Sequence, residues 1–444
     1  MRILLVQPPI KHSIHDAYRT EGLGIAYIAS ALRQKGHEVS LIDAHMQGLD
    51  LRRMITEILS RNFDALGITA ANAHRKALME IAKAVKSAKP DAIVCAGGYL
   101  PSLAHDRLLK ACPHLDFVVR GEGELVAVEV FGRIADGKEW RDVAGVAFRD
   151  GDEIVANQAP PLIKDLDSLP FPARDALKDS AFPIQSAGVC GARGCYSSCS
   201  FCCLRSFNKI NGSRIPRFRS PENIMAEIEQ VVKEVGVKQI RFVDDDFIGP
   251  GPKMRARVLA LADLLRKSNL GITFKIECRA DEVDADVLLP LKEAGLAEIY
   301  LGVESGIQRA LDTFNKGVTV EQNKKAIELV RSLGIKLRCG FIMFDPYLTT
   351  QELQENVQFI KEMGIDKEAA DGPAPLVTRL NIFHGVPLID KLKEDGLLVD
   401  DGFDYDYKHK NPEVGLMFKA SMACAACSSA VKRVKSVFSG KRKG

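Results

Sequence analysis

The stretch Gly194-Cys195-Tyr196-Ser197-Ser198-Cys199-Ser200-Phe201-Cys202 is the part of this chain from which its fold is most readily inferred. It places three cysteines at the spacing C-x-x-x-C-x-x-C. Three thiolates on one short loop can ligate three irons of a four-iron cube and leave the fourth iron without a protein ligand. An iron with an open site can bind and activate a small molecule, so the stretch predicts a catalytic iron–sulfur site at Cys195, Cys199 and Cys202.

Two other uses of these thiols stay open on spacing alone. A zinc site normally takes four ligands in two close pairs, and the second pair could come only from Cys190, Cys203 or the distant Cys424 and Cys427. A disulfide framework is not expected in a long chain that begins with a strand pattern and shows no signal peptide. Because Cys203 directly follows Cys202, we expect its side chain to point away from the cluster.

The composition is that of an ordinary soluble globular protein. The chain has 444 residues, 46% of them hydrophobic and 27% charged, which indicates two or three domains. Its 61 basic and 58 acidic residues give a net charge of +3, so there is no electrostatic case for nucleic acid binding. No run of about 18 apolar residues is present, so we expect no membrane span and a cytoplasmic location. Eleven cysteines then favour metal or redox chemistry over disulfides.

Strand and helix patterns alternate through the first 150 residues. Apolar runs predict strands at 2–6, 39–42, 65–69, 91–96 and 116–120, with helices at 24–35, 54–60 and 75–87. This alternation predicts a doubly wound, Rossmann-like parallel sheet that binds its ligand at the carboxyl ends of the strands.

Three of those strand ends are small or rich in glycine. They contain Gly67 with Thr69, Gly97 with Gly98, and Gly121 with Glu122. Such ends let a large ligand approach the backbone closely. No G-x-G-x-x-G follows the first strand, which argues against a dinucleotide. The alternative is a fold that keeps these glycines for turn geometry and binds nothing.

A second domain follows a proline-rich connector at residues 166–174. Strands are expected at 239–243, 273–278, 298–303, 336–344 and 378–383, with helices at 220–235, 253–268, 285–293, 320–333 and 350–363. Repeated strand–helix units predict a parallel α/β barrel of the TIM type, full or partial, with working loops at the strand carboxyl ends. We expect domains at 1–150 and 186–390, a linker at 151–185, and a C-terminal extension at 391–444.

The three-cysteine spacing is the signature of the radical S-adenosylmethionine (SAM) superfamily. Five pieces resemble the cobalamin-binding domain that precedes some radical SAM cores: Gln7-Pro8-Pro9, residues 23–28, Gly67-Ile68-Thr69, Gly97-Gly98 and residues 119–124. By this resemblance the chain is identified as a member of the cobalamin-dependent radical SAM enzymes, with the methyltransferase group favoured. The resemblance covers about residues 1–390. It implies three cofactors: a 4Fe–4S cluster, SAM and cobalamin.

The resemblance also implies roles for individual residues. Cys195, Cys199 and Cys202 would hold the cluster, and the glycine-rich strand ends would meet cobalamin. Asp244, in Asp244-Asp245-Asp246-Phe247, sits where the family has an acidic segment near SAM, and Arg279 would meet the SAM carboxylate. In Gly302-Val303-Glu304-Ser305-Gly306, Glu304 and Ser305 would meet the SAM amino group or ribose. Ordinary salt bridging is the alternative for the acids.

Several features depart from the family pattern. His45 lies in a D-x-H-x-x-G sequence, but after the second expected strand rather than the first, so we interpret it as a loop residue and expect no protein imidazole on the cobalt. Phe344 replaces a usual glycine and His384 a usual proline, which suggests an unusual substrate. Phe403, Tyr405 and Tyr407 could form a substrate lid. Cys424 and Cys427 lack a partner pair and are interpreted as reactive or incidental thiols.

The reaction implied by the resemblance begins with reductive cleavage of SAM to a 5'-deoxyadenosyl radical. That radical would abstract hydrogen from an unactivated carbon, and methylcobalamin would supply a methyl group. Cyclisation or rearrangement without methyl transfer, and a core with a vestigial cobalamin domain, remain alternatives. The implied partners are a small-molecule or peptide substrate and an electron donor such as flavodoxin or ferredoxin.

Overall fold

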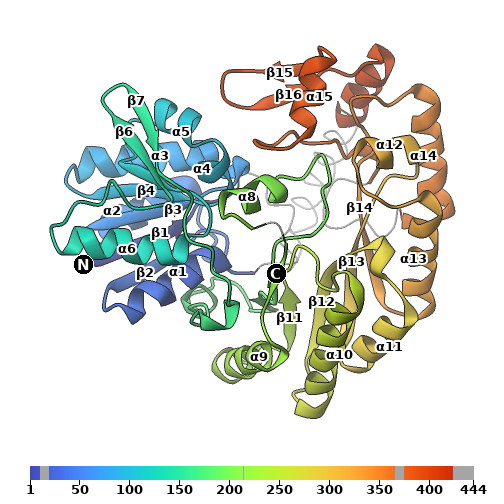
Figure 1. Ribbon diagram of the computed structural model, residues 1–444, viewed down its shortest axis with the longest axis horizontal. Coiled ribbons are helices and arrows are strands. Elements are labelled where there is room, and N and C mark those ends of the chain that lie inside the picture. The colour runs from blue at the N-terminus through green and yellow to red at the C-terminus, as the bar shows by residue number, and fades with distance from the viewer. Residues whose placement is uncertain (11–19, 214, 366–374, 424–444) are drawn as a thin grey trace, which may run out of the picture.

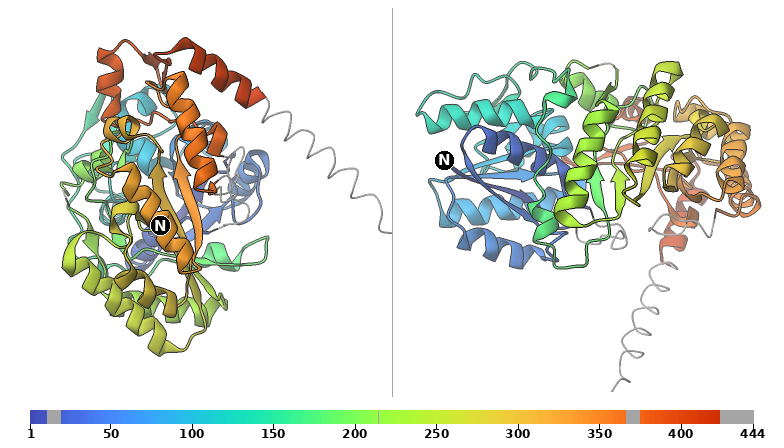
Figure 2. Two further views of the ribbon diagram at one scale, coloured as in Figure 1. Left: turned by 90° about the vertical axis from the view of Figure 1, so that its right-hand side faces the viewer. Right: turned by 90° about the horizontal axis from the view of Figure 1, so that it is seen from below.

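The computed structural model describes residues 1–10, 20–213, 215–365 and 375–423, and two α/β units lie side by side in it (Figures 1 and 2). Cys424 and Cys427 lie outside the described residues, as do His12 and His15. Every helix in the described ranges is too short or too polar to cross a lipid bilayer.

The first unit is a seven-stranded sheet in the order β2-β1-β3-β4-β5-β6-β7. Its strands are β1 (Arg2–Gln7), β2 (Glu38–Asp43), β3 (Ala65–Thr69), β4 (Ile93–Gly97), β5 (Phe117–Val119), β6 (Val146–Asp150) and β7 (Glu153–Ala156). Its helices are α1 (Leu23–Gln34), α2 (Leu51–Ser60), α3 (Arg75–Ala88), α4 (Tyr99–Leu103), α5 (His105–Ala111) and α6 (Gly123–Ala135). Strands β1 to β5 run parallel, and β6 and β7 close the sheet as an antiparallel hairpin.

Both faces of this sheet are buried, as expected of parallel strands with helices on each side. Because side chains alternate along a strand, Leu4 and Val6 of β1 enter one apolar core, while Ile3 and Leu5 enter the core on the opposite face. The continuous apolar run at the start of the chain is therefore explained, and the predicted doubly wound fold is confirmed.

The second unit is built on a five-stranded parallel sheet in the order β14-β13-β12-β11-β8. Its strands are β8 (Ala187–Val189), β11 (Gln239–Phe242), β12 (Thr273–Arg279), β13 (Leu296–Glu304) and β14 (Lys336–Phe341). The accompanying helices are α8 (Leu204–Ile210), α9 (Pro221–Val235), α10 (Gly251–Ser268), α11 (Ala285–Glu293), α12 (Gln308–Thr313), α13 (Val320–Ser332) and α14 (Thr350–Glu362). The barrel is therefore partial.

Local signals set several helix ends in this core. The Ser220 hydroxyl accepts a hydrogen bond from the Asn223 amide at 3.1 Å and caps α9, which Pro221 begins and Gly236 ends in a left-handed conformation. The predicted last strand at 378–383 is wrong. That segment makes only an isolated bridge between Phe344 and Arg379, so no ladder extends β14 further.

The C-terminal part of the described chain joins the two units. Helix α15 (Leu388–Glu394) leads into a hairpin of β15 (Leu398–Asp400) and β16 (Tyr405–Tyr407), drawn in red in Figure 1. Phe403, between these strands, packs into an apolar core of the first unit. Arg107 contacts Asp400 at 2.8 Å and Arg75 contacts Asp404 at 2.7 Å, so α5 and α3 both hold the hairpin.

The connector contributes a second, buried junction. Arg174 donates hydrogen bonds to Glu21, which precedes α1, and to Glu227 of α9. Glu227 also accepts from Arg219, so two guanidinium groups share its buried carboxylate. The predicted proline-rich connector therefore ends in a charge network that fixes the first unit against the second. The domain boundaries themselves stay a prediction.

Candidate cofactor sites

A cavity of about 420 Å³ lies at the carboxyl edge of the first sheet. All six residues predicted from the glycine-rich strand ends line it: Gly67, Thr69, Gly97, Gly98, Gly121 and Glu122. This is the edge at which doubly wound folds bind their ligands. His45 follows the edge strand β2 and is not among the lining residues.

The glycines that line the cavity serve different purposes. Gly98 has φ +99°, and a Cβ there would lie 2.9 Å from the Ala70 carbonyl oxygen, so only glycine fits. A Cβ on Gly67 would meet the Leu5 side chain at 2.7 Å, so that glycine serves core packing. A Cβ on Gly97 would have no neighbour closer than 3.8 Å, so packing does not require glycine there. The missing side chain leaves the backbone of the cavity wall uncovered.

The opposite wall of the cavity comes from the second unit. Gly194 before the first cluster cysteine, Asp245 after β11, and Leu204, Phe207 and Asn208 of α8 all line it. Helix α8 begins two residues after Cys202. The Phe207 ring lies 4.7 Å from the ring of Tyr99 on α4, centroid to centroid. The cavity is therefore bounded on one side by the segment that carries the three predicted cluster ligands.

Charged contacts hold the two walls together at the end of β5. Arg217 donates to both carboxylate oxygens of Glu122, and Arg193 contacts Glu124 at 2.6 Å. The Asn211 side-chain oxygen accepts from the Glu122 amide at 3.0 Å. Glu122 was predicted as a cofactor-binding residue from its place in the sequence. The structure ties its carboxylate to the second unit while its backbone borders the cavity.

The loop that carries Cys195, Cys199 and Cys202 lies between the short strand β9 (Ala192–Arg193) and α8. Cys199 is buried, and the Ser197 hydroxyl lies 3.2 Å from its sulfur. Burial raises the pKa of the Cys195 and Cys202 thiols to about 12 each. Both groups are therefore protonated at neutral pH unless a metal displaces the proton.

Neighbouring segments clamp this loop. The Ser200 amide donates to the Phe314 carbonyl at 2.7 Å, and the Ser200 hydroxyl donates to the Thr313 carbonyl at 2.8 Å. In the described ranges, no three His, Cys, Asp or Glu side chains are arranged to hold a single metal ion. A cubane site needs no such arrangement, because each thiolate binds a different iron. Three thiols on one clamped loop thus fit an iron–sulfur cluster.

Positive charge surrounds the buried cysteine. Arg279, at the end of β12, donates to the Ser197 hydroxyl at 2.7 Å and approaches the Cys199 sulfur at 3.9 Å. Lys316 lies 3.1 Å from the Glu304 carboxylate, and its own carbonyl accepts from Arg279. Glu304 has φ +64°, an unfavourable conformation for a residue other than glycine. The structure thus brings the predicted residues Arg279 and Glu304 together beside the loop at 194–203, which carries the three predicted cluster ligands and is called the cluster loop below.

The three consecutive aspartates after β11 face different surroundings. Asp244 accepts from the Gly191 amide at 2.6 Å, and burial raises its pKa to about 7. Asp245 lines the cavity. Asp246 faces Glu282, and burial together with that neighbouring acid raises the pKa of Asp246 well above its ordinary value. Only Asp244 of the three was predicted as a site residue, and its contact with SAM stays a prediction.

Ser305 does not join Glu304 at the cluster loop. It is fully buried, its hydroxyl lies 3.2 Å from the side-chain oxygen of Asn356 on α14, and it accepts from the Ile307 amide at 3.2 Å. Within the G-x-E-S-G sequence, the structure therefore assigns Ser305 to the hydrogen-bonding of the helix that follows. Its predicted contact with SAM stays a prediction.

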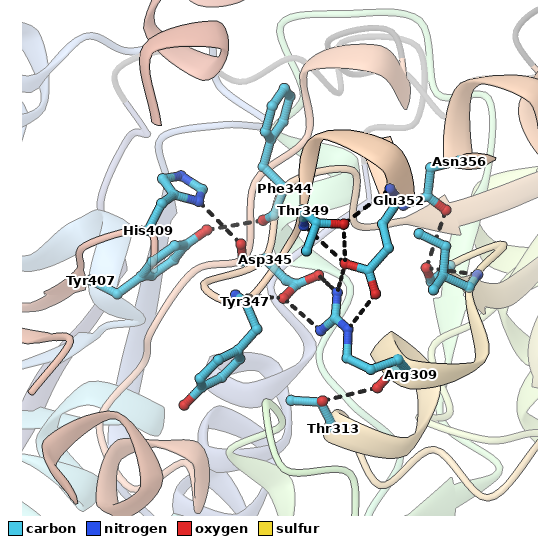
Figure 3. A network of polar contacts seen from close by, with 12 residues as sticks. Arg309, Thr313, Phe344, Asp345, Tyr347, Thr349, Glu352, Asn356, Tyr407 and His409 are labelled. Atoms are coloured by element: carbon cyan, nitrogen blue, oxygen red, sulfur yellow. Dashed lines mark hydrogen bonds and ion pairs between the residues drawn. The ribbon is translucent and has the colours of Figure 1, made fainter. Parts of the chain in front are cut away.

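A polar network supports α12, from whose carboxyl end the cluster loop is held. Arg309 contacts Asp345 at 3.0 Å and Glu352 at 2.8 Å, as Figure 3 shows. Glu352 also forms the capping box of α14 with Thr349. Sequence reasoning missed this network. The Thr349-x-x-Glu352 pattern marks the helix start, but nothing in the sequence pairs it with Arg309.

Both departures from the family pattern meet the C-terminal segment. Phe344 is buried, its ring lies 5.2 Å from Phe418, and its carbonyl accepts from the Tyr407 hydroxyl (Figure 3). His384 packs against Phe403 and Tyr405, with ring centroids 5.7 and 5.1 Å away. These residues serve to dock the extension on the core, a use that the substrate-lid hypothesis did not foresee.

Comparisons with known proteins agree with this two-part architecture. Residues 14–131 match the family model of the B12 binding domain, and residues 189–360 match that of the radical SAM superfamily. The two domains confirm the predicted cofactors, which are cobalamin for the first and SAM with a 4Fe–4S cluster for the second.

Two curated relatives carry different activities in their names. An uncharacterised methyltransferase of Pyrococcus horikoshii is 29% identical over 371 residues, which cover 82% of this chain and 79% of the relative. The anaerobic magnesium-protoporphyrin IX monomethyl ester cyclase of Rubrivivax gelatinosus is 30% identical over 381 residues, which cover 82% of this chain but 66% of the cyclase.

A solved structure has a similar fold over most of this chain. The cobalamin-dependent SAM radical enzyme OxsB, solved with aqua-cobalamin and SAM bound, superposes with a TM-score of 0.79 over 94% of this chain and 66% of OxsB, at 22% sequence identity. From its two matched domains, this chain belongs to the cobalamin-dependent radical SAM enzymes.

Proposed function

We propose that this enzyme transfers a SAM-derived methyl group to an unactivated carbon of a small-molecule or peptide substrate. The observation that carries the proposal is the shared wall between the cavity and the cluster loop. Because α8 both lines the cavity and follows Cys202 within two residues, a corrinoid held in the cavity would face the chemistry at the cluster.

In this proposal the bound cofactors supply radical generation from SAM and a methyl group, and the protein supplies placement. Cys195, Cys199 and Cys202 would hold the cluster. Arg279 and Lys316 would offset the negative charge of the thiolates and of the SAM carboxylate. Gly97 and Gly98 would let the corrin ring lie against the strand ends. The name of the Pyrococcus relative supports methyl transfer as the outcome.

The second candidate is cyclisation without methyl transfer, favoured by the similarity to the Rubrivivax cyclase. The two candidates use the same cofactors and differ in the fate of the SAM methyl group. A methyltransferase must load that group onto the corrinoid before turnover, whereas a cyclase of this kind need not.

The decisive experiment therefore needs no substrate. The protein is reconstituted anaerobically with iron, sulfide and hydroxocobalamin, reduced, and incubated with SAM labelled with ¹³C in its methyl group. We expect S-adenosylhomocysteine to form and the label to appear in the extracted corrinoid. Formation of 5'-deoxyadenosine with no label in the corrinoid would favour the cyclase instead. An enzyme that forms neither product would contradict both candidates.

A further inference from the structure

His74 is a buried histidine of the first unit that the sequence did not single out. It closes a short 3₁₀ turn (Asn72–His74) between β3 and α3 and lines the cavity beside Thr69 and Gly98. It is 8% exposed, and its Nε2 atom has no hydrogen-bond partner among the described residues. A buried polar atom without a partner is rare in folded proteins and points to a ligand when it borders a cavity.

The hydrogen bond at Nδ1 of His74 determines whether Nε2 carries a hydrogen. The Ala71 amide donates to His74 Nδ1 at 3.0 Å. A nitrogen that accepts a hydrogen bond carries no proton, so in the neutral ring the hydrogen is on Nε2. Burial lowers the pKa of His74 to about 4, so the ring is uncharged at neutral pH. Nε2 is therefore an uncharged donor on a residue that lines the cavity.

We propose that His74 binds the corrinoid by donating its Nε2 hydrogen to an oxygen acceptor of that molecule. The proposal rests on the function proposed above, since it requires cobalamin in this cavity. Cobalamin offers two kinds of acceptor, the amide carbonyls around the corrin ring and the phosphate and ribose of its nucleotide tail. Both share the chemistry that a neutral N–H recognises.

The same geometry argues against His74 as a cobalt ligand. Coordination through Nε2 needs that atom unprotonated, which would move the hydrogen to Nδ1 and set it against the Ala71 N–H. Two donors would then face each other and the turn would lose its hydrogen bond. His74 thus contributes to holding the corrinoid while leaving the cobalt without a protein imidazole.

Corrinoid binding by the full-length, reconstituted protein tests the proposal. Hydroxocobalamin is titrated anaerobically into wild type, His74→Ala and His74→Gln, and Kd is measured from the absorption change. We expect Kd to rise about tenfold in His74→Ala, the loss of one hydrogen bond, and to recover partly in His74→Gln, whose amide keeps a donor. Iron content and melting temperature report whether each variant is folded.

His105 offers a matched control. It is a histidine of the same unit with an unpartnered ring nitrogen, but it does not line the cavity. His105→Ala should leave Kd unchanged. If wild type binds and His74→Ala binds equally well, the role of His74 is wrong while the proposed function stands. If wild type itself binds no cobalamin, the proposed function is contradicted, and the proposal for His74, which rests on it, is contradicted with it.

Two further measurements sharpen the assignment. Cobinamide keeps the corrin amides but lacks the nucleotide tail, so a weakened affinity of His74→Ala for both corrinoids places the acceptor on the ring. A loss seen with cobalamin alone places it on the tail. The electron paramagnetic resonance spectrum of the bound cob(II)alamin should not change when histidine is labelled with ¹⁵N. A change in nitrogen hyperfine splitting would show coordination and overturn the donor role.

Discussion

The two walls of the cavity are built on different principles. The wall from the first unit consists mostly of strand ends, glycines and apolar side chains, with the uncharged ring of His74 among them, and its carboxylates Glu122 and Glu124 are paired with arginines of the second unit. The wall from the second unit includes Gly194 and Leu204, which flank the segment of the three thiols, and Arg279, Lys316 and the buried acids Asp246 and Glu282 come from the strand ends and loops of the same unit. The first wall can accept a large ligand because its backbone is open, whereas the second must balance the charges around the thiols. Substitutions in the two walls should therefore impair different properties of the protein.

The largest effect is expected at the charged wall. Cys199→Ala should abolish cluster assembly and SAM cleavage, because Cys199 is the buried thiol beside Arg279 and a cube needs all three ligands. The measurements are iron content and anaerobic formation of 5'-deoxyadenosine. Cys203→Ala is the matched control and should retain both. Undiminished deoxyadenosine formation in Cys199→Ala would refute the cluster assignment.

The next effect tests the contact between the walls. Glu122 and Arg217 are each at least nine-tenths buried, so removing one partner leaves an uncompensated charge. Glu122→Leu should lower the free energy of unfolding by about 3–5 kcal/mol. The double variant Glu122→Leu/Arg217→Met should cost less than this, because neither charge of the pair is left without its partner. Denaturant unfolding of the three proteins checks the order, and a double variant less stable than the single one would contradict it.

The glycine-rich wall of the first unit should respond to backbone strain. Gly98→Ala places a non-glycine residue at φ +99° and its Cβ 2.9 Å from the Ala70 carbonyl oxygen, which should cost about 1–3 kcal/mol of stability. We expect weaker hydroxocobalamin binding with unchanged iron content. Gly132→Ala, where an added Cβ meets nothing within 4 Å, is the control and should leave both unchanged. A loss of iron in Gly98→Ala would contradict the expectation that the two walls affect corrinoid binding and iron content separately.

Most of the fold could be predicted, because long apolar runs and helix caps are local signals. Strand β8 was missed because it has three residues with a central glycine, and α8 and α12 are too short for a helical period to appear. The strand expected at 378–383 failed for the opposite reason. Apolar and polar residues alternate there as in a strand, but the segment pairs with its neighbour only through one isolated bridge.

The candidate site could be predicted where chemistry follows from spacing. The three cysteines and the glycine-rich strand ends are of this kind. The directions of the three adjacent aspartates depend on the turn after β11, so the sequence could not show that Asp244 accepts from the Gly191 amide, that Asp245 lines the cavity and that Asp246 faces Glu282. The pairs Arg217–Glu122 and Arg309–Asp345 join residues that are far apart in the chain, so only the folded structure reveals them.

The smallest effect concerns the hairpin that spans both units. Arg107 pairs with Asp400 across a partly exposed contact, which limits its contribution to about 0.2–1 kcal/mol. Asp400→Asn should lower stability by that amount at low salt and by less at high salt, because salt screens exposed charges. The measurement is denaturant unfolding at two salt concentrations.

The pH dependence of this pair has a definite sign. The hydrogen bonds from Arg107 lower the pKa of Asp400 to about 2, below the value of about 3.9 in an unfolded chain. The stabilisation is therefore complete above about pH 4 and disappears as the pH falls toward 2. Wild type and Asp400→Asn should differ most near neutral pH and converge in acid. A difference that grew in acid would show that the hairpin is held by its buried Phe403 alone and that the ion pair opposes docking.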